Sequence, residues 1–441
     1  MRLGKLLGVR EFLWILVPAL LLIGLAFLVT FQFVQPAPPS RIVVAAASKG
    51  SPYYALADRY REFMALNGVT LEIRETSGTF ENLKLLRSGE AKAGFLQGGV
   101  ANSVQEPELL SLGRVLHEPI WIFHDAALPL DRLSDLKGKR ILVGPAGGGT
   151  NYVALRLLAA SGVTPETATF VNMELPDYVD ALNNGQADAG FLVLGASAVT
   201  VSRLLSSPKL KLLNLAQADA YAQRFPYLTR IRLKRGVIDF ARDIPSADVA
   251  MVATTAAFVV REDLHSALAN LLTQALVVVH SQPAVDKNGE TGVFERSGEF
   301  PVQTDPEFPL SDQAYRVYRN GAPFLQRYLP FWLATIADRL VLLLIPLIGI
   351  LLPVLRFTPL IYTWRVRRRI LRWYRELQRI EAGFDPRAGA EHRAQKLAQI
   401  DKVEHAADRL PVPLGFANQL YDLRQHIELV RRRVAEAPAA V

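Results

Sequence analysis

The chain contains a strand, loop and helix pattern that occurs twice, 99 residues apart (140 − 41). A second matched pair follows at nearly the same offset: Gly-Glu-Ala-Lys-Ala-Gly-Phe-Leu at 89–96 returns as Gly-Gln-Ala-Asp-Ala-Gly-Phe-Leu at 185–192. Each copy predicts an apolar strand, a loop of small residues, a helix, and a second helix that ends at glycine before a short strand. The sequence therefore predicts two related α/β lobes. The matched positions in the first pair are Arg41 and Arg140, Gly50 and Gly149, Tyr53 and Tyr152, and Leu56 and Leu155.

The segment after the second copy indicates how the lobes connect. Residues 118–124 are apolar enough for a strand that leaves the first lobe, and 231–240 and 249–260 also have strand patterns, before a helix at 263–279. We expect the chain to cross back and complete the first lobe, so that two crossings form a hinge. This assigns 41–123 and 245–330 to the first lobe and 124–244 to the second.

Apolar residues, 50% of the 441 residues, are concentrated near both ends. No charge occurs from Phe12 to Val34, a length that crosses a hydrocarbon core of about 30 Å at about 1.5 Å per residue. The basic residues before it also fit a signal peptide, but the run is long for one and 35–40 offers no typical cleavage site. The sequence predicts an N-terminal segment at 1–11, a span at 12–34 and a proline-rich linker at 35–40.

A second apolar run, Leu340 to Leu355, is shorter, and flanking residues lengthen it if Arg339 and Arg356 extend toward water. A buried core helix is the alternative, but the run has no polar face. We expect a second span at 333–356. Basic residues before the first run and after the second place both termini in the cytoplasm and 41–330 in the periplasm or outside the cell, with the protein in the inner (plasma) membrane.

Apolar residues recur at helical spacing in 357–441, which predicts a helical cytoplasmic tail with a break at Pro411 and Pro413. The tail either packs on itself as an anchor or transmits a signal.

Two loops carry the predicted chemistry. Gly147, Gly148 and Gly149, followed by Thr150 and Asn151, precede a helix, where free N–H groups and the helix dipole stabilise an anion. An ordinary capped turn is the alternative reading.

The second loop, Ser77, Gly78 and Thr79, either contacts a ligand or caps the next helix. Gln97 ends a strand and either reaches a cleft or enters a loop.

Other classes of function lack a signature. The sequence has no G-x-S-x-G, H-E-x-x-H or G-x-G-x-x-G motif, and its 7 histidines are scattered. The net charge of +8 comes largely from the tail, so it does not require nucleic acid as a partner, and there is no cysteine. We expect no enzyme activity, no metal and no cofactor.

The motifs in 53–54, 76–86, 89–97, 143–150 and 185–190, in this order and spacing, resemble the TAXI family of TRAP transporter solute receptors over about 41–330. The resemblance implies a type II periplasmic-binding-protein fold closing on a small carboxylate or amino acid, with TRAP-type membrane subunits and the lipid bilayer as partners. A ligand sensor that signals through the tail is the alternative. By motif, the ligand contacts are Ser48, Lys49, Gly50, Tyr53, Tyr54, Ser77, Gly78, Thr79, Gln97, Gly147, Gly148, Gly149, Thr150, Asn151 and Gly195.

Overall fold

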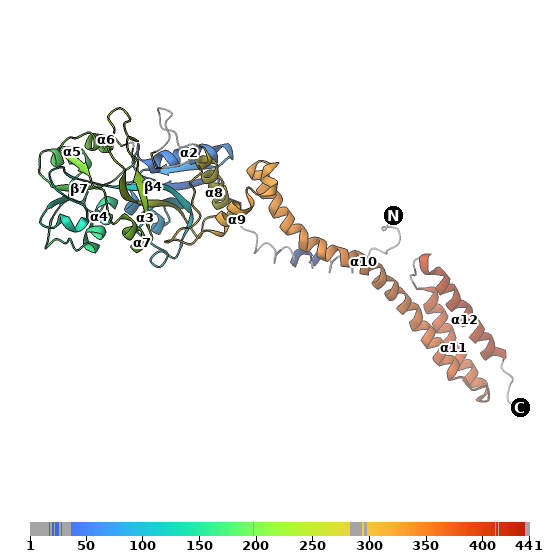
Figure 1. Ribbon diagram of the computed structural model, residues 1–441. Coiled ribbons are helices and arrows are strands. Elements are labelled where there is room, and N and C mark those ends of the chain that lie inside the picture. The colour runs from blue at the N-terminus through green and yellow to red at the C-terminus, as the bar shows by residue number, and fades with distance from the viewer. Residues whose placement is uncertain are drawn as a thin grey trace. The chain divides into compact units, whose positions relative to one another are not determined.

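The computed structural model describes residues 37–436 apart from 197, 283–292, 295–297, 411 and 413, together with a few residues between 17 and 28. The chain divides into two compact units, Pro36–Ala337 on one hand and Met1–Gln35 with Asp338–Val441 on the other (Figure 1). The first unit carries the repeated pattern, and the second carries the helical tail.

The α/β unit is built on strands in the order β2-β1-β3-β10-β4-β7-β5-β6, with β8 paired to β4 and β9 to β10. The short strands β1 to β3 and β5 to β7 form the two repeats, and their neighbours within each repeat are parallel. The strands are β1 Arg41–Ala45, β2 Thr70–Arg74, β3 Ala93–Gln97, β4 Leu109–Asp125, β5 Arg140–Leu142, β6 Thr169–Val171, β7 Ala189–Val193, β8 Leu210–Leu212, β9 Leu228–Leu233 and β10 Val249–Arg261.

Two long strands join the lobes. β10 pairs with β9 over 249–254 and with β3 over 256–260, so it passes from the second lobe into the first. β4 pairs with β10 over 109–119 and with β7 over 120–124, so it passes the other way. Both crossings between the lobes are therefore continuous β-strands.

Helices cover the strands, and their sequences explain where they begin and end. α2 (Pro52–Leu66) starts at Ser51, whose Oγ accepts from the Tyr54 N–H at 3.2 Å, with proline at the first helical position. Its buried side chains recur at helical spacing. The other helices of this unit are α3 Thr79–Ser88, η2 Leu133–Leu136, α4 Gly149–Ala160, α5 Leu175–Asn183, α6 Val199–Leu205, α7 Ala218–Arg224, α8 Ser266–Ser281, α9 Asp312–Asn320 and η3 Phe324–Arg327.

An aromatic cluster fills the first lobe beneath α2 and α8. Tyr53 stacks on Phe95 with ring centroids 5.0 Å apart, and Phe258 meets both Phe95 and Tyr60 edge to face. Each such ring contributes roughly 1.5–3 kcal/mol through burial. Tyr53, predicted as a ligand contact, thus lies in this core.

Two predicted strands differ from the structure. The strand expected at 231–240 ends at Leu233, because Gly236 has φ of 73° and Asp243 has φ of 56°, conformations that turn the chain. β4 begins at Leu109, well before the expected start at Glu118. Its buried polar residues Ser111 and Arg114 interrupt the apolar pattern that marks a strand.

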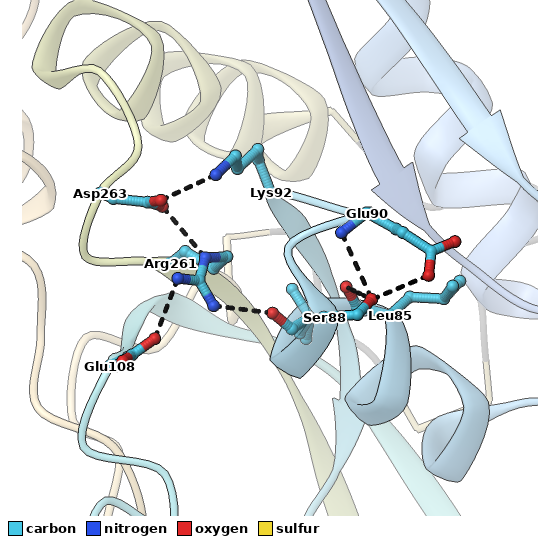
Figure 2. Close-up of polar contacts among 8 residues, drawn as sticks. Leu85, Ser88, Glu90, Lys92, Glu108, Arg261 and Asp263 are labelled. Carbon is cyan, nitrogen blue, oxygen red and sulfur yellow. Dashed lines mark hydrogen bonds and ion pairs between the residues drawn. The ribbon is translucent and has the colours of Figure 1, made fainter.

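The repeats are fastened differently at equivalent positions. In the second lobe, Arg140 donates to Asp188 at 2.8 Å and to the Gly185 carbonyl at 2.8 Å. The position equivalent to Asp188 is Lys92 (188 − 96), and Lys92 pairs with Asp263 at 2.7 Å. Figure 2 shows Asp263 between Lys92 and Arg261. Lys92 is positive where the second repeat has the negative Asp188, and this difference is explained by the different partner of each residue.

Arg261 links three segments at this end of the first lobe. It pairs with Glu108 at 2.9 Å (Figure 2). It also donates to the carbonyl of Leu86 near the end of α3 at 2.9 Å. The contacts hold the end of β10 against α3.

The tail unit has its own core. α11 (Gly389–Asp408) and α12 (Ala417–Glu436), with η4 (Leu414–Phe416) before α12, pack against the C-terminal part of α10 (Phe331–Ala382) (Figure 1). Arg431 of α12 pairs with Asp401 of α11 at 2.6 Å and with Glu404. The tail is helical where it is described, as predicted, and 411 and 413 lie outside the described residues. The core residues are Val366, Ile370, Leu377, Ile380, Ile400, Val403, Ala407, Leu423, Ile427, Val430 and Val434.

The structure contradicts the expected localisation with two membrane spans. Within the described residues, no helix has the length and apolar character needed to cross a membrane. The uninterrupted apolar run within α10, from Leu340 to Leu355, is 16 residues, or about 24 Å at about 1.5 Å per residue, shorter than a core of about 30 Å. The span expected at 12–34 lies mostly outside the described residues.

Candidate functional site

The loop before α2, which holds the predicted contacts Ser48, Lys49 and Gly50, is tied to its own lobe. Lys49 pairs with Glu75 at 3.1 Å, and the hydrogen bond with Glu75 raises the pKa of Lys49. The Ser48 carbonyl accepts from the Ser51 N–H at 3.1 Å, and Gly50 has φ of 90°. The loop therefore forms a capped turn before α2, and Tyr54 contributes its N–H to that cap.

Tyr53 reaches a glutamate in one of the crossing strands. Its hydroxyl donates to Glu118 Oε1 at 2.7 Å, and Thr254 of β10 donates to Glu118 Oε2 at 3.0 Å. Burial raises the pKa of Glu118 to about 7, against the two hydrogen bonds, which lower it. A carboxyl group that titrates near neutral pH thus lies where the lobes are joined.

The second predicted loop, 77–79, is filled by a carboxylate of the same helix. Glu81 Oε2 accepts from Ser77 N at 2.6 Å and from Ser77 Oγ at 2.9 Å, and these bonds lower the pKa of Glu81. Gly78 has φ of 125° and begins α3. Negative charge already occupies this helix start, so a second anion would be repelled there.

Thr79 and Gln97 lie together at the end of β3. Thr79 Oγ1 accepts from the Gln97 N–H at 3.1 Å, and both residues are buried. This bond continues β3 toward the start of α3, and it directs the Gln97 side chain beyond the sheet.

The glycine loop of the second lobe is shaped for a close approach. Gly147 has φ of 73°, and Gly148 precedes the first turn of α4. The first N–H groups of a helix have no partner within it, and here they belong to Gly149, Thr150 and Asn151. Thr150 Oγ1 faces the sheet, where it accepts from Val193 N at 3.2 Å.

The remaining predicted residue, Gly195, lies in the segment after β7, where its carbonyl accepts from Ala198 N at 3.1 Å.

The two lobes meet at the predicted residues. Gln97 Nε2 of the first lobe donates to the Gly149 carbonyl of the second at 3.4 Å. A Cβ on Gly149 would lie 2.1 Å from Gln97 Oε1, so glycine is needed for this contact. Nearby, Phe80 meets Tyr152 edge to face with centroids 5.8 Å apart. The structure thus brings Gln97, Thr79 and 149–151 to one interlobe contact.

Sequence reasoning missed four charged residues near this contact. Arg156 of α4 donates to the Gly99 carbonyl at 3.0 Å, again linking the lobes. Glu307 accepts from the Gly99 N–H at 2.8 Å, and burial raises the pKa of Glu307 to about 7. Glu118 and Arg114 lie in β4. Arg156 lies one turn after Tyr152 in the repeated helix, and Glu118 opens the strand predicted at 118–124, so these two lay near signals in the sequence.

No group of three or more His, Asp or Glu side chains in the described part of the chain is arranged to hold a metal ion. The groups at the site suit the binding of a ligand. They are helix N–H groups without a partner in the helix, a side-chain amide and guanidinium groups, all near the contact between the lobes.

Two α/β lobes joined by shared strands, with loops that meet between them, define a fold of the periplasmic-binding-protein type. The NMT1-like family matches residues 44–319, which is 276 of 441 residues (319 − 44 + 1). The chain belongs to the NMT1-like family. The match does not single out the TAXI family within it.

Solved structures are similar to parts of the chain. The periplasmic aliphatic sulphonate binding protein SsuA from Escherichia coli is 17% identical over 42% of this chain and 64% of its own, with a TM-score of 0.33. SsuA from Xanthomonas axonopodis pv. citri, bound to MOPS, is 23% identical over 40% and 61%, with a TM-score of 0.30. The chain thus spans less than two thirds of each SsuA protein.

AbpA from Streptococcus pneumoniae, an amino acid ABC transporter substrate-binding protein bound to L-arginine, is 14% identical. The similarity covers 54% of this chain and 87% of AbpA, with a TM-score of 0.33.

Proposed function

We propose that the chain is a solute receptor whose two lobes close on a small organic acid or amino acid. The observation that carries the proposal is the contact from Gln97 Nε2 to the Gly149 carbonyl, which joins a strand end of one lobe to a helix start of the other. Two lobes joined by the strands β4 and β10 can rotate about them, and a solute held between the loops favours the closed arrangement.

The solute's anionic group is expected at the start of α4 rather than α3. The first-turn N–H groups of 149–151 have no partner within the helix, whereas the Glu81 carboxylate already lies at the start of α3, where it accepts from the Ser77 N–H. The two loops therefore differ in charge, which suits a solute with two unlike ends.

We assign the receptor to the TAXI family and propose that it delivers its solute to TRAP-type membrane subunits. The order of the motifs at 76–86, 89–97 and 143–150 supports this assignment. It is tested by asking whether the purified chain and candidate membrane subunits restore solute uptake in reconstituted vesicles, with either component alone as the control. No uptake beyond that of each component alone would contradict the assignment.

Binding is tested by titration calorimetry of the full-length chain against dicarboxylates, keto acids, acidic amino acids and neutral sugars. We expect saturable binding of at least one carboxylate. Gln97→Ala should weaken that binding about tenfold, or about 1.4 kcal/mol, because the interlobe contact is lost. Binding of neutral sugars alone would contradict the proposal.

A sensor that signals through the tail is the second candidate, and the separate core of α10, α11 and α12 favours it. A receptor for transport should keep full uptake when the core residue Leu423 is replaced, whereas a sensor should lose its response.

A further inference from the structure

The turn at Gly98 and Gly99, directly after β3, is enclosed by groups from distant parts of the chain. Glu307 accepts from Gly99 N with both oxygens, at 2.8 and 3.0 Å. Arg156 donates to the Gly99 carbonyl at 3.0 Å. The Tyr227 ring lies against Gly99, where a Cβ would be 2.8 Å from a ring carbon.

Several polar groups around this turn have unused hydrogen-bonding capacity. Arg114 is 9% exposed, and its guanidinium donates to the Tyr227 carbonyl at 3.4 Å without an ion pair in the described part of the chain. The Tyr227 hydroxyl and Thr255 Oγ1 are buried and find no hydrogen-bond partner among the described residues. Each buried polar group that is left without a hydrogen bond costs roughly 1–3 kcal/mol of folding free energy.

The charges at the turn act on one another. Burial lowers the pKa of Arg114, and the nearby carboxylates of Asp305 and Glu307 oppose that effect. Arg114 and Arg156 in turn favour the ionised form of Glu307. The arginines come from different lobes, Arg114 from the first-lobe part of β4 and Arg156 from α4.

We infer that Arg114, Arg156, Tyr227 and Thr255, here named the Gly99 cluster, form a binding site for a small oxyanion. Donors predominate among the unused groups, and a guanidinium presents paired N–H groups that match the oxygens of a carboxylate or sulfate. The inference rests on the proposed function in one respect: the oxyanion is a second anionic group of the solute, apart from the one at the start of α4. Ordered water is the other occupant that would satisfy these groups.

Inorganic sulfate is the probe that separates the two occupants. The unfolding midpoint of the full-length chain is measured while sodium sulfate replaces sodium chloride at constant ionic strength. We expect a saturable rise of about 2–4 °C near tenfold the dissociation constant, above the linear effect that sulfate has on any protein.

Arg156→Gln should abolish the saturable part of the rise in unfolding midpoint. Arg203→Gln is the matched control, because Arg203 lies on α6 with a side chain 58% exposed, beside Asp180 at 3.8 Å. The Arg203→Gln variant should retain the full sulfate-dependent rise in unfolding midpoint. A wild-type response without saturation, or one that Arg156→Gln keeps, would overturn the inference and leave water as the occupant.

Tyr227→Phe keeps the test decisive if Arg156→Gln is poorly folded. Removing an unpartnered buried hydroxyl should leave the sulfate-free protein as stable as wild type or more so, yet weaken sulfate binding about threefold to tenfold. Unchanged sulfate affinity in a folded Tyr227→Phe variant would contradict the site.

The result is independent of the search for the natural solute. Saturable sulfate binding with no organic solute bound would refute the proposed function and support the site. Binding of an organic acid that Arg156→Gln and Tyr227→Phe leave unchanged would support the receptor and refute the site.

Discussion

The side-chain amide of Gln97 donates to the carbonyl oxygen of Gly149 at 3.4 Å, and the Gln97 Oε1 atom occupies the space that a Cβ on Gly149 would need. One residue ends β3 in the first lobe, and the other begins α4 in the second. The glycine is required by this close approach, since it does not have a positive φ. The pair therefore reports directly on whether the lobes are together.

Gly149→Ala should weaken solute binding about tenfold. The new Cβ would displace the Gln97 side chain from a position 2.1 Å away and so disfavour the closed arrangement. Stability without solute should not fall, because alanine favours a helix more than glycine does. Titration calorimetry and urea unfolding measure the two effects.

The control is the same substitution in a Gln97→Ala background, where no long side chain remains to be displaced. Gly149→Ala should then change affinity by less than about twofold. Equal losses in both backgrounds would show that the two residues act independently.

Glu118 should make the protein more stable in mild acid. Its pKa is raised by burial from an ordinary 4.5 to about 7, so folding favours the protonated carboxyl. This contribution is fully present below pH 4.5 and is lost as the pH rises through 7, on the order of 3 kcal/mol in total. Urea unfolding of wild type and Glu118→Gln at several pH values measures it as a difference.

Thr254→Val serves as the companion variant. Thr254 donates to Glu118 and favours its ionised form, so removing that donor should raise the pKa further. The pH above which the stability difference stops changing should move upward. A difference between wild type and Glu118→Gln that is constant from pH 4.5 to 7.5 would contradict this account.

The two repeats should respond unequally at equivalent positions. Asp188→Ala should cost about 1–2 kcal/mol, because its carboxylate accepts from both the side chain and the backbone N–H of Arg140, the latter at 2.7 Å. Lys92→Ala should cost under about 1 kcal/mol, because its pair with Asp263 is exposed, and 0.5 M salt should reduce that cost. Urea unfolding at two salt concentrations compares them, and equal costs would argue against the assigned partners.

Leu423→Ala should destabilise the tail by about 2–5 kcal/mol through loss of a fully buried side chain. The α/β unit should unfold at its original temperature, because the two units have separate cores. Calorimetric scans of wild type and variant resolve the transitions. A matching drop in the stability of the α/β unit would show that the cores are coupled.

The repeat predicted the two lobes well because periodicity is local. Gln97 was named as the end of a strand and Gly149 as part of the repeated loop, and their contact joins positions 52 residues apart. Glu307 was not predicted, since no local pattern marks a carboxylate that meets Gly99 from 208 residues away. The span predicted at 333–356 depended on flanking residues to lengthen an apolar run of 16 residues, and the length of that run alone falls short of a hydrocarbon core of about 30 Å.

Distance measurement between the lobes tests the central claim most directly. The chain has no cysteine, so spin labels at Lys84→Cys on α3 and Asp177→Cys on α5 report on the two lobes alone. We predict that a saturating solute found by calorimetry shifts the distance distribution and narrows it, and that Gly149→Ala reduces the shift. An unchanged distribution with solute bound would contradict a receptor that works by closing its lobes.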